Sequence, residues 1–311
     1  MTVAAAPRFL PPAAFVASEG ALRRTWSAEE SSEYTRWLAT HHYENFHVVS
    51  FLLPKKLHQD FFNVYAYCRW ADDLGDEIGD RARSLELLEW WRGGLDAMYA
   101  GRATHPVFTA LAGTVERYGI PRAPFADLID AFVQDQTVTR YRDWEELFGY
   151  CRRSANPVGR LVLYLGGYSD ERRQALSDAT CTALQLANFW QDVTVDLLKD
   201  RVYIPLEILE RHGYTLEQLF ARQFAPAFRE TMREAVEKAR ELFLAGLPLV
   251  AMVDRRLALD LDLFSRGGMR VLEKIEARGY DVLAARPAIS RVERLGLLVG
   301  ALARRVFSRA A

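Results

Sequence analysis

The sequence predicts an all-α fold in a single domain, and three observations lead to this prediction. Apolar residues recur at the helical period along most of the chain, with Gly or Pro at the joints between periodic stretches. No stretch shows the alternation of apolar and polar residues that a half-buried strand requires. No repeat, linker or shift in composition marks a boundary, so one domain is the simplest account of residues 27–311.

The first expected helix follows a poorly ordered start. Residues 1–26 are rich in Ala and Pro, and we expect them to be poorly ordered. Ser27 and Glu30 have the spacing of a capping box, which predicts a helix from there to about Leu38. Residues 41–54 break the helical period and predict a loop. Later helices are expected near 56–78, 84–100, 104–118, 122–138, 143–153, 156–168, 170–198, 205–212, 215–223, 226–245, 251–278 and 290–308.

Composition argues against several classes of protein. The net charge of −1 gives no overall field that would attract nucleic acid. Cys68, Cys151 and Cys181 are scattered among apolar neighbours, which is typical of reduced core residues rather than of disulfides or a zinc site. The start lacks the pattern of a secretory signal, and no stretch of ~20 apolar residues exists. We therefore expect a cytoplasmic protein without a transmembrane helix.

The helix expected over residues 170–198 carries one polar stripe. Asn188, Asp192 and Asp196 recur every fourth residue and share a face, which Gln185 joins. The other faces are apolar, so burying this stripe without partners would be costly. Carboxylate and amide oxygens suit Mg²⁺ or Mn²⁺ better than zinc, so the stripe is predicted to form part of a metal site. A solvent-facing helix with spaced acids is the alternative.

The helix expected over residues 56–78 carries a second acidic pair. Asp72 and Asp76 share a face, and Tyr65 and Arg69 precede them on it. Acids this close raise one another's pKa unless a cation neutralises them. Two such helices therefore predict divalent ions between them, with phosphate oxygens of a substrate as further ligands. A surface cluster of acids is the alternative for this motif.

Several segments resemble the motifs of the squalene/phytoene synthase family, in the family's order and over about residues 40–290. The matching residues are Tyr65, Ala66, Cys68 and Arg69; Asp72 and Asp76; Tyr150, Cys151, Ala155, Val158 and Gly159; Asn188, Asp192 and Asp196; Arg201, Tyr203 and Pro205; and Ile275, Glu276, Gly279, Tyr280 and Asp281. Each motif is weak alone, and together they are specific. The resemblance implies an all-α isoprenoid synthase bundle with a central cavity that binds Mg²⁺ and a prenyl diphosphate.

The resemblance also implies roles for individual residues. The implied Mg²⁺ ligands are Asp72, Asp76, Asn188, Asp192 and Asp196. The implied substrate contacts are Tyr65, Arg69, Gln185, Lys199, Arg201 and Tyr203, with His42, Tyr43 and Asn45 from the loop near residue 45. Asp72, Asp76 and Asp192 are implied to be catalytic, because loss of diphosphate needs its charge neutralised. Gln185 is expected to be catalytic as a residue that positions water. A structural role for His42, a surface role for Lys199, and a role for Arg69 limited to an ion pair remain alternatives.

Two segments, residues 42–46 and 186–192, resemble one branch of the family, the hydroxysqualene synthases of hopanoid biosynthesis. Gln191 stands where the wider family usually has Arg, and Arg152 and Arg153 stand where squalene-forming members often have Tyr. This branch implies that presqualene diphosphate and water give hydroxysqualene and diphosphate, without NADPH. Gln185 or Gln191 is expected to hold the water.

Two other functions stay open. The nearest enzymatic alternative is head-to-head condensation of two farnesyl diphosphates to presqualene diphosphate, squalene or dehydrosqualene. The alternative of another class is an inactive scaffold for neighbouring enzymes of the squalene pathway. The five intact metal positions argue against a scaffold.

The C-terminal stretch, residues 286–311, is basic and amphipathic. Its arginines, set against the single acid Glu293, are Arg286, Arg291, Arg294, Arg304, Arg305 and Arg309. A helix of this kind can rest on an anionic membrane surface, and a lipophilic substrate and product would favour such peripheral contact. A closing helix packed on the core is the alternative.

Overall fold

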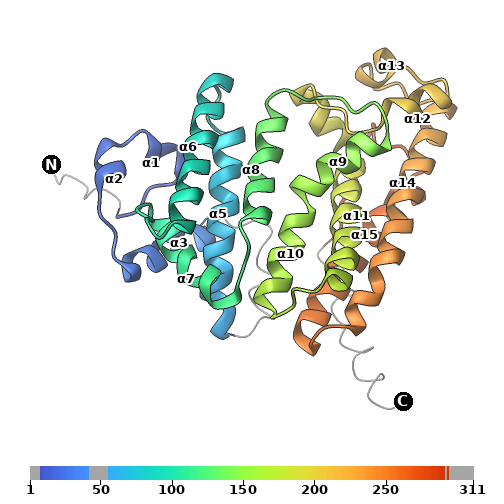
Figure 1. Ribbon diagram of the computed structural model, residues 1–311. Coiled ribbons are helices and arrows are strands. Elements are labelled where there is room, and N and C mark those ends of the chain that lie inside the picture. Colours follow the sequence, from blue (N-terminus) through green and yellow to red (C-terminus); the bar gives the residue numbers. More distant parts are fainter. Residues whose placement is uncertain (1–7, 42–54, 291–292, 294–311) are drawn as a thin grey trace. The chain divides into compact units, whose positions relative to one another are not determined.

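The computed structural model describes residues 8–41, 55–290 and 293 (Figure 1). Within them every regular element is a helix, and the one strand-like feature is an isolated parallel bridge between Arg140 and Val202. The prediction of an all-α fold is therefore confirmed. The chain divides into two compact units, residues 1–137 and 138–311, at a point where the sequence pattern shows no boundary. Each unit is described by itself.

The first unit is built of helices, and those from residue 28 onward begin and end close to the expected positions. They are α1 (Pro12–Val16), α2 (Glu19–Arg23), α3 (Ala28–His41), η1 (Lys55–Leu57), α5 (His58–Asp76), α6 (Arg81–Tyr99), α7 (Pro106–Tyr118) and α8 (Ala123–Asp135). The predicted capping box of α3 is present, because the backbone N–H of Glu30 donates to Ser27 Oγ and that of Ser27 donates to Glu30 Oε2, both at 3.1 Å.

Helices α1 and α2 occupy part of the segment that the sequence pattern predicts to be poorly ordered. The ring of Phe15 in α1 is buried, with its centroid 5.2 Å from that of Trp70 and 4.9 Å from that of His105. Trp70 in turn stacks on Trp91, with ring centroids 5.0 Å apart and planes 7° from parallel. Helix α1 is thus held by a tertiary contact, which outweighs its weak local preference.

Polar contacts fix the rotation of α5 about its own axis. Asn63 Oδ1 accepts a hydrogen bond of 2.7 Å from Thr35 in α3, and its amide donates 3.0 Å to Thr114 in α7. Asn63 and Asp72 are nine residues apart, or about two and a half helical turns. The acidic stripe of α5 therefore lies on the side opposite these bonds.

The second unit is built around the long helix α11. Its helices are α9 (Trp144–Ser154), α10 (Asn156–Leu165), α11 (Glu171–Asp196), η2 (Leu197–Lys199), α12 (Leu206–Arg211), α13 (Leu216–Phe220), α14 (Pro226–Gly246), η3 (Leu247–Ala251) and α15 (Arg255–Ala277). Helices α10, α14 and α15 pack against α11 (Figure 1). Gly246 allows close approach, since a Cβ there would lie 2.1 Å from Thr180 Oγ1 of α11. The helix expected over residues 290–308 falls almost wholly outside the described residues.

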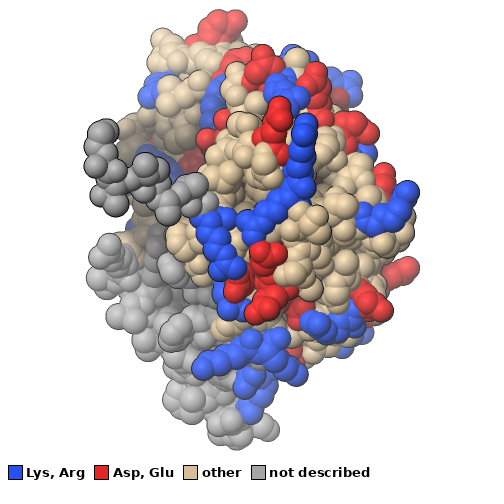
Figure 2. Space-filling model, turned by 90° about the vertical axis from the view of Figure 1, so that its left-hand side faces the viewer, with Lys and Arg blue, Asp and Glu red and all other residues tan. Residues whose placement is uncertain are grey.

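Two further features of the described residues are the apolar character of the helices and the distribution of charge on the surface. Within residues 8–41, 55–290 and 293, no helix combines the length and apolar character needed to cross a membrane. Figure 2 shows Lys and Arg interspersed with Asp and Glu over the face in view. This mixture fits the near-zero net charge and offers no broad basic surface on that face.

Candidate active site

The first half-site is the stripe of Tyr65, Arg69, Asp72 and Asp76 on α5. Asp76 is exposed at the C-terminal end of the helix, while the other three side chains are partly buried. Arg69 Nη1 lies 3.2 Å from Asp72 Oδ2, and the same guanidinium pairs with the buried carboxylate of Asp73. The ion pair considered as the alternative role of Arg69 therefore exists, and it orients the guanidinium beside Asp72.

Burial and mutual repulsion raise the pKa values of the acids in the first half-site by more than the charge of Arg69 lowers them. Burial raises the pKa of Asp72 to about 6; Arg69 opposes this shift and Asp76 adds to it. Burial also raises the pKa of Asp73, against the effect of Arg69. A single guanidinium thus does not neutralise this cluster, which would accept a further cation.

The second half-site is the stripe of Gln185, Asn188, Asp192 and Asp196 on α11. The helix is continuous from Glu171 to Asp196, so their spacing places them on one face as predicted. Asn188 is exposed, and the other three side chains are partly buried. Burial raises the pKa of Asp196 to about 7, and the neighbouring charge of Asp192 adds to the shift.

The loop after α11 brings two more predicted residues beside Asp196. The backbone N–H of Arg201 donates to Asp196 O at 2.9 Å, and Val202 N–H donates to Thr139 O at 2.9 Å. A small pocket is lined by Phe189, Val193, Asp196, Leu197, Arg201, Val202, Tyr203, Ile204 and Leu219. Asp196, Arg201 and Tyr203 therefore meet at one pocket, whereas Lys199 is exposed.

The ring of Tyr203 is part of the core of the second unit. It stacks on Phe189 of α11, with ring centroids 3.7 Å apart and planes 5° from parallel. Only 8% of Tyr203 is exposed. This contact fastens the loop to α11 and so fixes the position of Arg201 relative to Asp196.

Arg286 is a contact of the second half-site that the sequence pattern did not reveal. The pattern assigns it to the basic C-terminal stretch, yet its guanidinium forms an ion pair with Asp192. Beside it, the amide of Gln191 donates to the carbonyl of Pro287. The only signal in the sequence was the position of Arg286 shortly after the motif that ends at Asp281.

Three of the predicted substrate contacts, His42, Tyr43 and Asn45, lie outside the described residues. The remaining site residues form the two half-sites, whose donors are carboxylate and amide oxygens. Among the described residues, no three His, Cys, Asp or Glu side chains gather as one metal site. Carboxylate and amide oxygens are the donor types that Mg²⁺ takes in proteins, one or two at a time, with water and phosphate filling its shell.

Comparisons with known proteins agree with the motifs. A model of the squalene/phytoene synthase family matches residues 39–293. Phytoene synthase of Thermus thermophilus is 34% identical over 258 residues, covering 83% of this chain and 87% of that protein. Hydroxysqualene synthase of Rhodopseudomonas palustris is 33% identical over 274 residues, covering 87% of this chain and 91% of that protein.

A solved structure extends this likeness to three dimensions. Squalene synthase HpnC from Alicyclobacillus acidocaldarius is 43% identical, with a TM-score of 0.79, covering 82% of this chain and 96% of that chain. The family match includes both helices that carry the acidic stripes. The chain therefore belongs to the squalene/phytoene synthase family of isoprenoid synthases.

Proposed function

We propose that this protein is a Mg²⁺-dependent enzyme that converts presqualene diphosphate and water to hydroxysqualene and diphosphate. The observation that carries the proposal is the pair of acidic stripes, on α5 and on α11, each of which contains a partly buried carboxylate whose pKa is raised. The pKa of Asp72 is raised to about 6 and that of Asp196 to about 7, each mainly by burial. Keeping such carboxylates ionised in a folded protein favours the binding of a cation.

In this proposal the ligands of Mg²⁺ are Asp72, Asp76, Asn188, Asp192 and Asp196. The bound metal would neutralise the charge that develops on the departing diphosphate. Arg69, oriented by its pairs with Asp72 and Asp73, and Arg201, at the pocket of Asp196, would bind phosphate oxygens through planar guanidinium groups.

Gln185 is the proposed holder of the water that attacks the cation. It lies three residues before Asn188 on the same face of α11. Gln191, the other candidate, donates its amide hydrogen to Pro287 O, which leaves it less free to orient a water. A primary amide can accept from a water through its oxygen and so orient the lone pair that forms the new C–O bond.

The choice of the hydroxysqualene synthase branch rests on sequence identity to known proteins and on one residue that differs from the wider family. The identity of 43% to squalene synthase HpnC and of 33% to a hydroxysqualene synthase supports it. Gln191, in place of the usual Arg, supports it too. The phytoene synthase at 34% identity keeps a condensation of two prenyl diphosphates as the second candidate.

The test supplies the purified protein with Mg²⁺ and without NADPH. Presqualene diphosphate, farnesyl diphosphate and geranylgeranyl diphosphate are offered separately, in water enriched in ¹⁸O, and the lipids are identified by mass spectrometry. Labelled hydroxysqualene from presqualene diphosphate alone supports the proposal, and a condensation product from either of the other two supports the second candidate. Asp192→Asn should abolish diphosphate release, whereas Glu237→Gln, which removes an exposed acid of α14, should not. No release from any substrate would favour the scaffold.

We also propose that the protein works in the cytoplasm and touches the membrane through the basic stretch after residue 290. This proposal rests on the sequence pattern, because most of the stretch lies outside the described residues. Flotation with anionic vesicles tests it: replacing Arg304, Arg305 and Arg309 with Gln should reduce the bound fraction, and replacing Arg81, Arg83 and Arg102 should not. Equal binding of all three proteins would contradict the proposal.

A further inference from the structure

We propose that Arg286 acts as a built-in competitor for metal at Asp192. Its guanidinium holds this carboxylate, and a divalent cation must displace it in order to bind there. The inference rests on the proposed role of Asp192 as a metal ligand. It adds that the second half-site already contains a cationic group, the guanidinium of Arg286, which a metal ion would have to displace.

The contact between the two side chains uses both carboxylate oxygens. Arg286 Nε donates to Asp192 Oδ1, and Arg286 Nη2 donates to Oδ2 at 3.1 Å. Such a fork-shaped pair is charge-assisted and geometrically specific. Only 15% of the Asp192 side chain is exposed, so little of the carboxylate is left open to another ligand. A metal ion that binds either oxygen must break at least one of these bonds.

Electrostatics adds to the steric argument. A guanidinium and a divalent cation on the same carboxylate repel each other, and partial burial of that carboxylate weakens the screening by water. The ion and Arg286 therefore compete for Asp192 rather than share it. Removing the guanidinium should therefore raise the affinity of this site for a divalent cation.

The backbone around Arg286 is itself fastened in place, which distinguishes this contact from a chance surface pair. We call residues 281–290 the strap. Asp281 Oδ1 accepts from the N–H groups of Leu283 and Ala284 at 3.1 and 3.0 Å, and Arg278 donates to Ala285 O at 2.9 Å. Leu283 is buried, so the strap has an apolar anchor just before Arg286.

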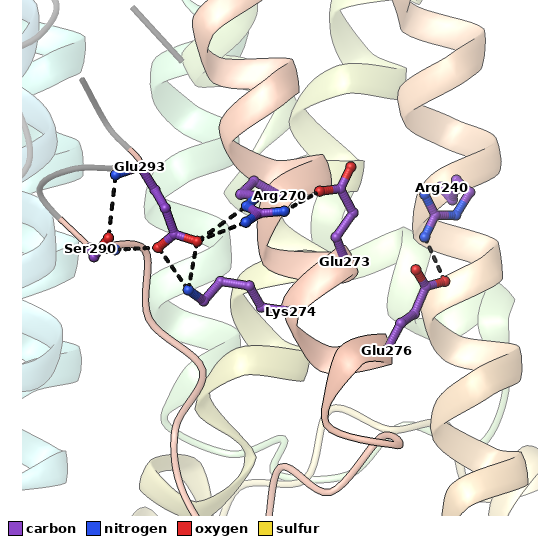
Figure 3. A network of polar contacts seen from close by, with 7 residues as sticks. All are labelled: Arg240, Arg270, Glu273, Lys274, Glu276, Ser290 and Glu293. Atoms are coloured by element: carbon purple, nitrogen blue, oxygen red, sulfur yellow. Dashed lines mark hydrogen bonds and ion pairs between the residues drawn. The ribbon is translucent and has the colours of Figure 1, made fainter. Parts of the chain in front are cut away.

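The far end of the strap is held by a second cluster, shown in Figure 3. Glu293 accepts hydrogen bonds from Lys274 Nζ at 2.7 Å, from Arg270 Nη2 at 2.9 Å and from the N–H of Ser290 at 2.8 Å. Lys274 and Arg270 belong to α15. With both ends tied, release of Asp192 requires the side chain of Arg286 to move rather than the whole strap.

The experiment measures Mn²⁺ binding to the full chain without substrate, by electron paramagnetic resonance of the free ion. Arg286→Gln should bind Mn²⁺ about 3- to 10-fold more tightly than the wild type, the range expected for loss of a partly exposed ion pair. Arg233→Gln is the matched control, since it removes a guanidinium of similar exposure, 48% against 49%, that pairs with Glu230 and Glu237 and not with the acidic stripe. Its affinity should equal that of the wild type.

Arg286→Lys keeps the charge and loses the fork, so its affinity should fall between those of the wild type and Arg286→Gln. This variant also tests the proposal if Arg286→Gln does not fold. Unchanged or weaker binding by the Arg286 variants, or an equal gain in Arg233→Gln, would overturn the competition. If none of the proteins binds Mn²⁺, even with inorganic diphosphate, the proposed metal role fails as well. If the wild type binds Mn²⁺ and the Arg286 variants bind it no better, the competition alone fails.

Discussion

Metal binding at the second half-site should depend steeply on pH, because one of its acids is protonated near neutrality. Burial raises the pKa of Asp196 to about 7, the charge of Asp192 adds to this, and Arg201 opposes it. A carboxyl group must lose its proton before it can coordinate a metal ion. Binding of Mg²⁺ or Mn²⁺ should therefore release a proton from Asp196 below pH 7.

The size of the effect follows from this pKa. At pH 6 a group with a pKa of about 7 is protonated in about ten molecules of eleven, and at pH 8 in about one of eleven. The apparent affinity should thus fall about tenfold from pH 8 to pH 6. Asp72, with a pKa of about 6, should add a further factor of about two at pH 6. Carboxyl groups with an ordinary pKa near 4 would give no change in this range.

Isothermal titration calorimetry in buffers of different ionisation enthalpy gives both the affinity and the number of protons released. In the wild type we expect about 0.9 protons per ion from Asp196 at pH 6 and about 0.1 at pH 8. Asp196→Asn should lose this release and keep the smaller contribution of Asp72. An affinity that does not change between pH 6 and pH 8, or an Asp196→Asn variant with the full slope, would refute the reasoning.

Three further changes test the fold and the site. Asp260 is 2% exposed, its two carboxylate oxygens have no hydrogen-bond partner, and burial raises its pKa to about 7. Since the folded pKa lies above the unfolded one, the protonated group costs the folded state little below pH 4, and its ionisation destabilises the fold increasingly as pH rises from 4 to 7; Asp260→Asn should match the wild type at pH 4 and exceed its stability by about 4 kcal/mol at pH 8 in thermal unfolding. Gly246→Ala should cost about 1–3 kcal/mol in urea unfolding because its Cβ would meet Thr180, whereas Gly267→Ala, with open space around it, should cost nothing. Gln185→Leu should reduce the share of hydroxysqualene among the lipids seen by mass spectrometry, and an unchanged product ratio would remove Gln185 from the mechanism.

Local sequence patterns predicted most of the helices, because their signals are local. The capping box of Ser27 and Glu30 is a contact between residues three apart, and it forms as predicted. The four-residue spacing of Asn188, Asp192 and Asp196 likewise needs only a continuous helix to place them on one face. Such features depend on neighbours in the chain, which the sequence shows directly.

The features that were missed depend on partners far away in the chain. Helix α1 is held by Phe15, whose partner Trp70 lies on another helix, and five residues are too few to show a helical period. Arg286 and Asp192 are 94 residues apart, and no local pattern separates this arginine from the others of the basic stretch. Tertiary contacts of this kind cannot be read from periodicity or spacing.

The parallel stacking of Trp70 on Trp91 gives the first unit an optical marker of its own. Two indoles whose centroids are 5.0 Å apart couple their electronic transitions, which should add a signal of their own to the circular dichroism. In the second unit the described pair Trp144 and Trp190 is wider, at 6.2 Å, and nearly perpendicular. Melting of residues 1–137 could therefore be followed by this signal separately from the rest of the chain, without any added dye or label.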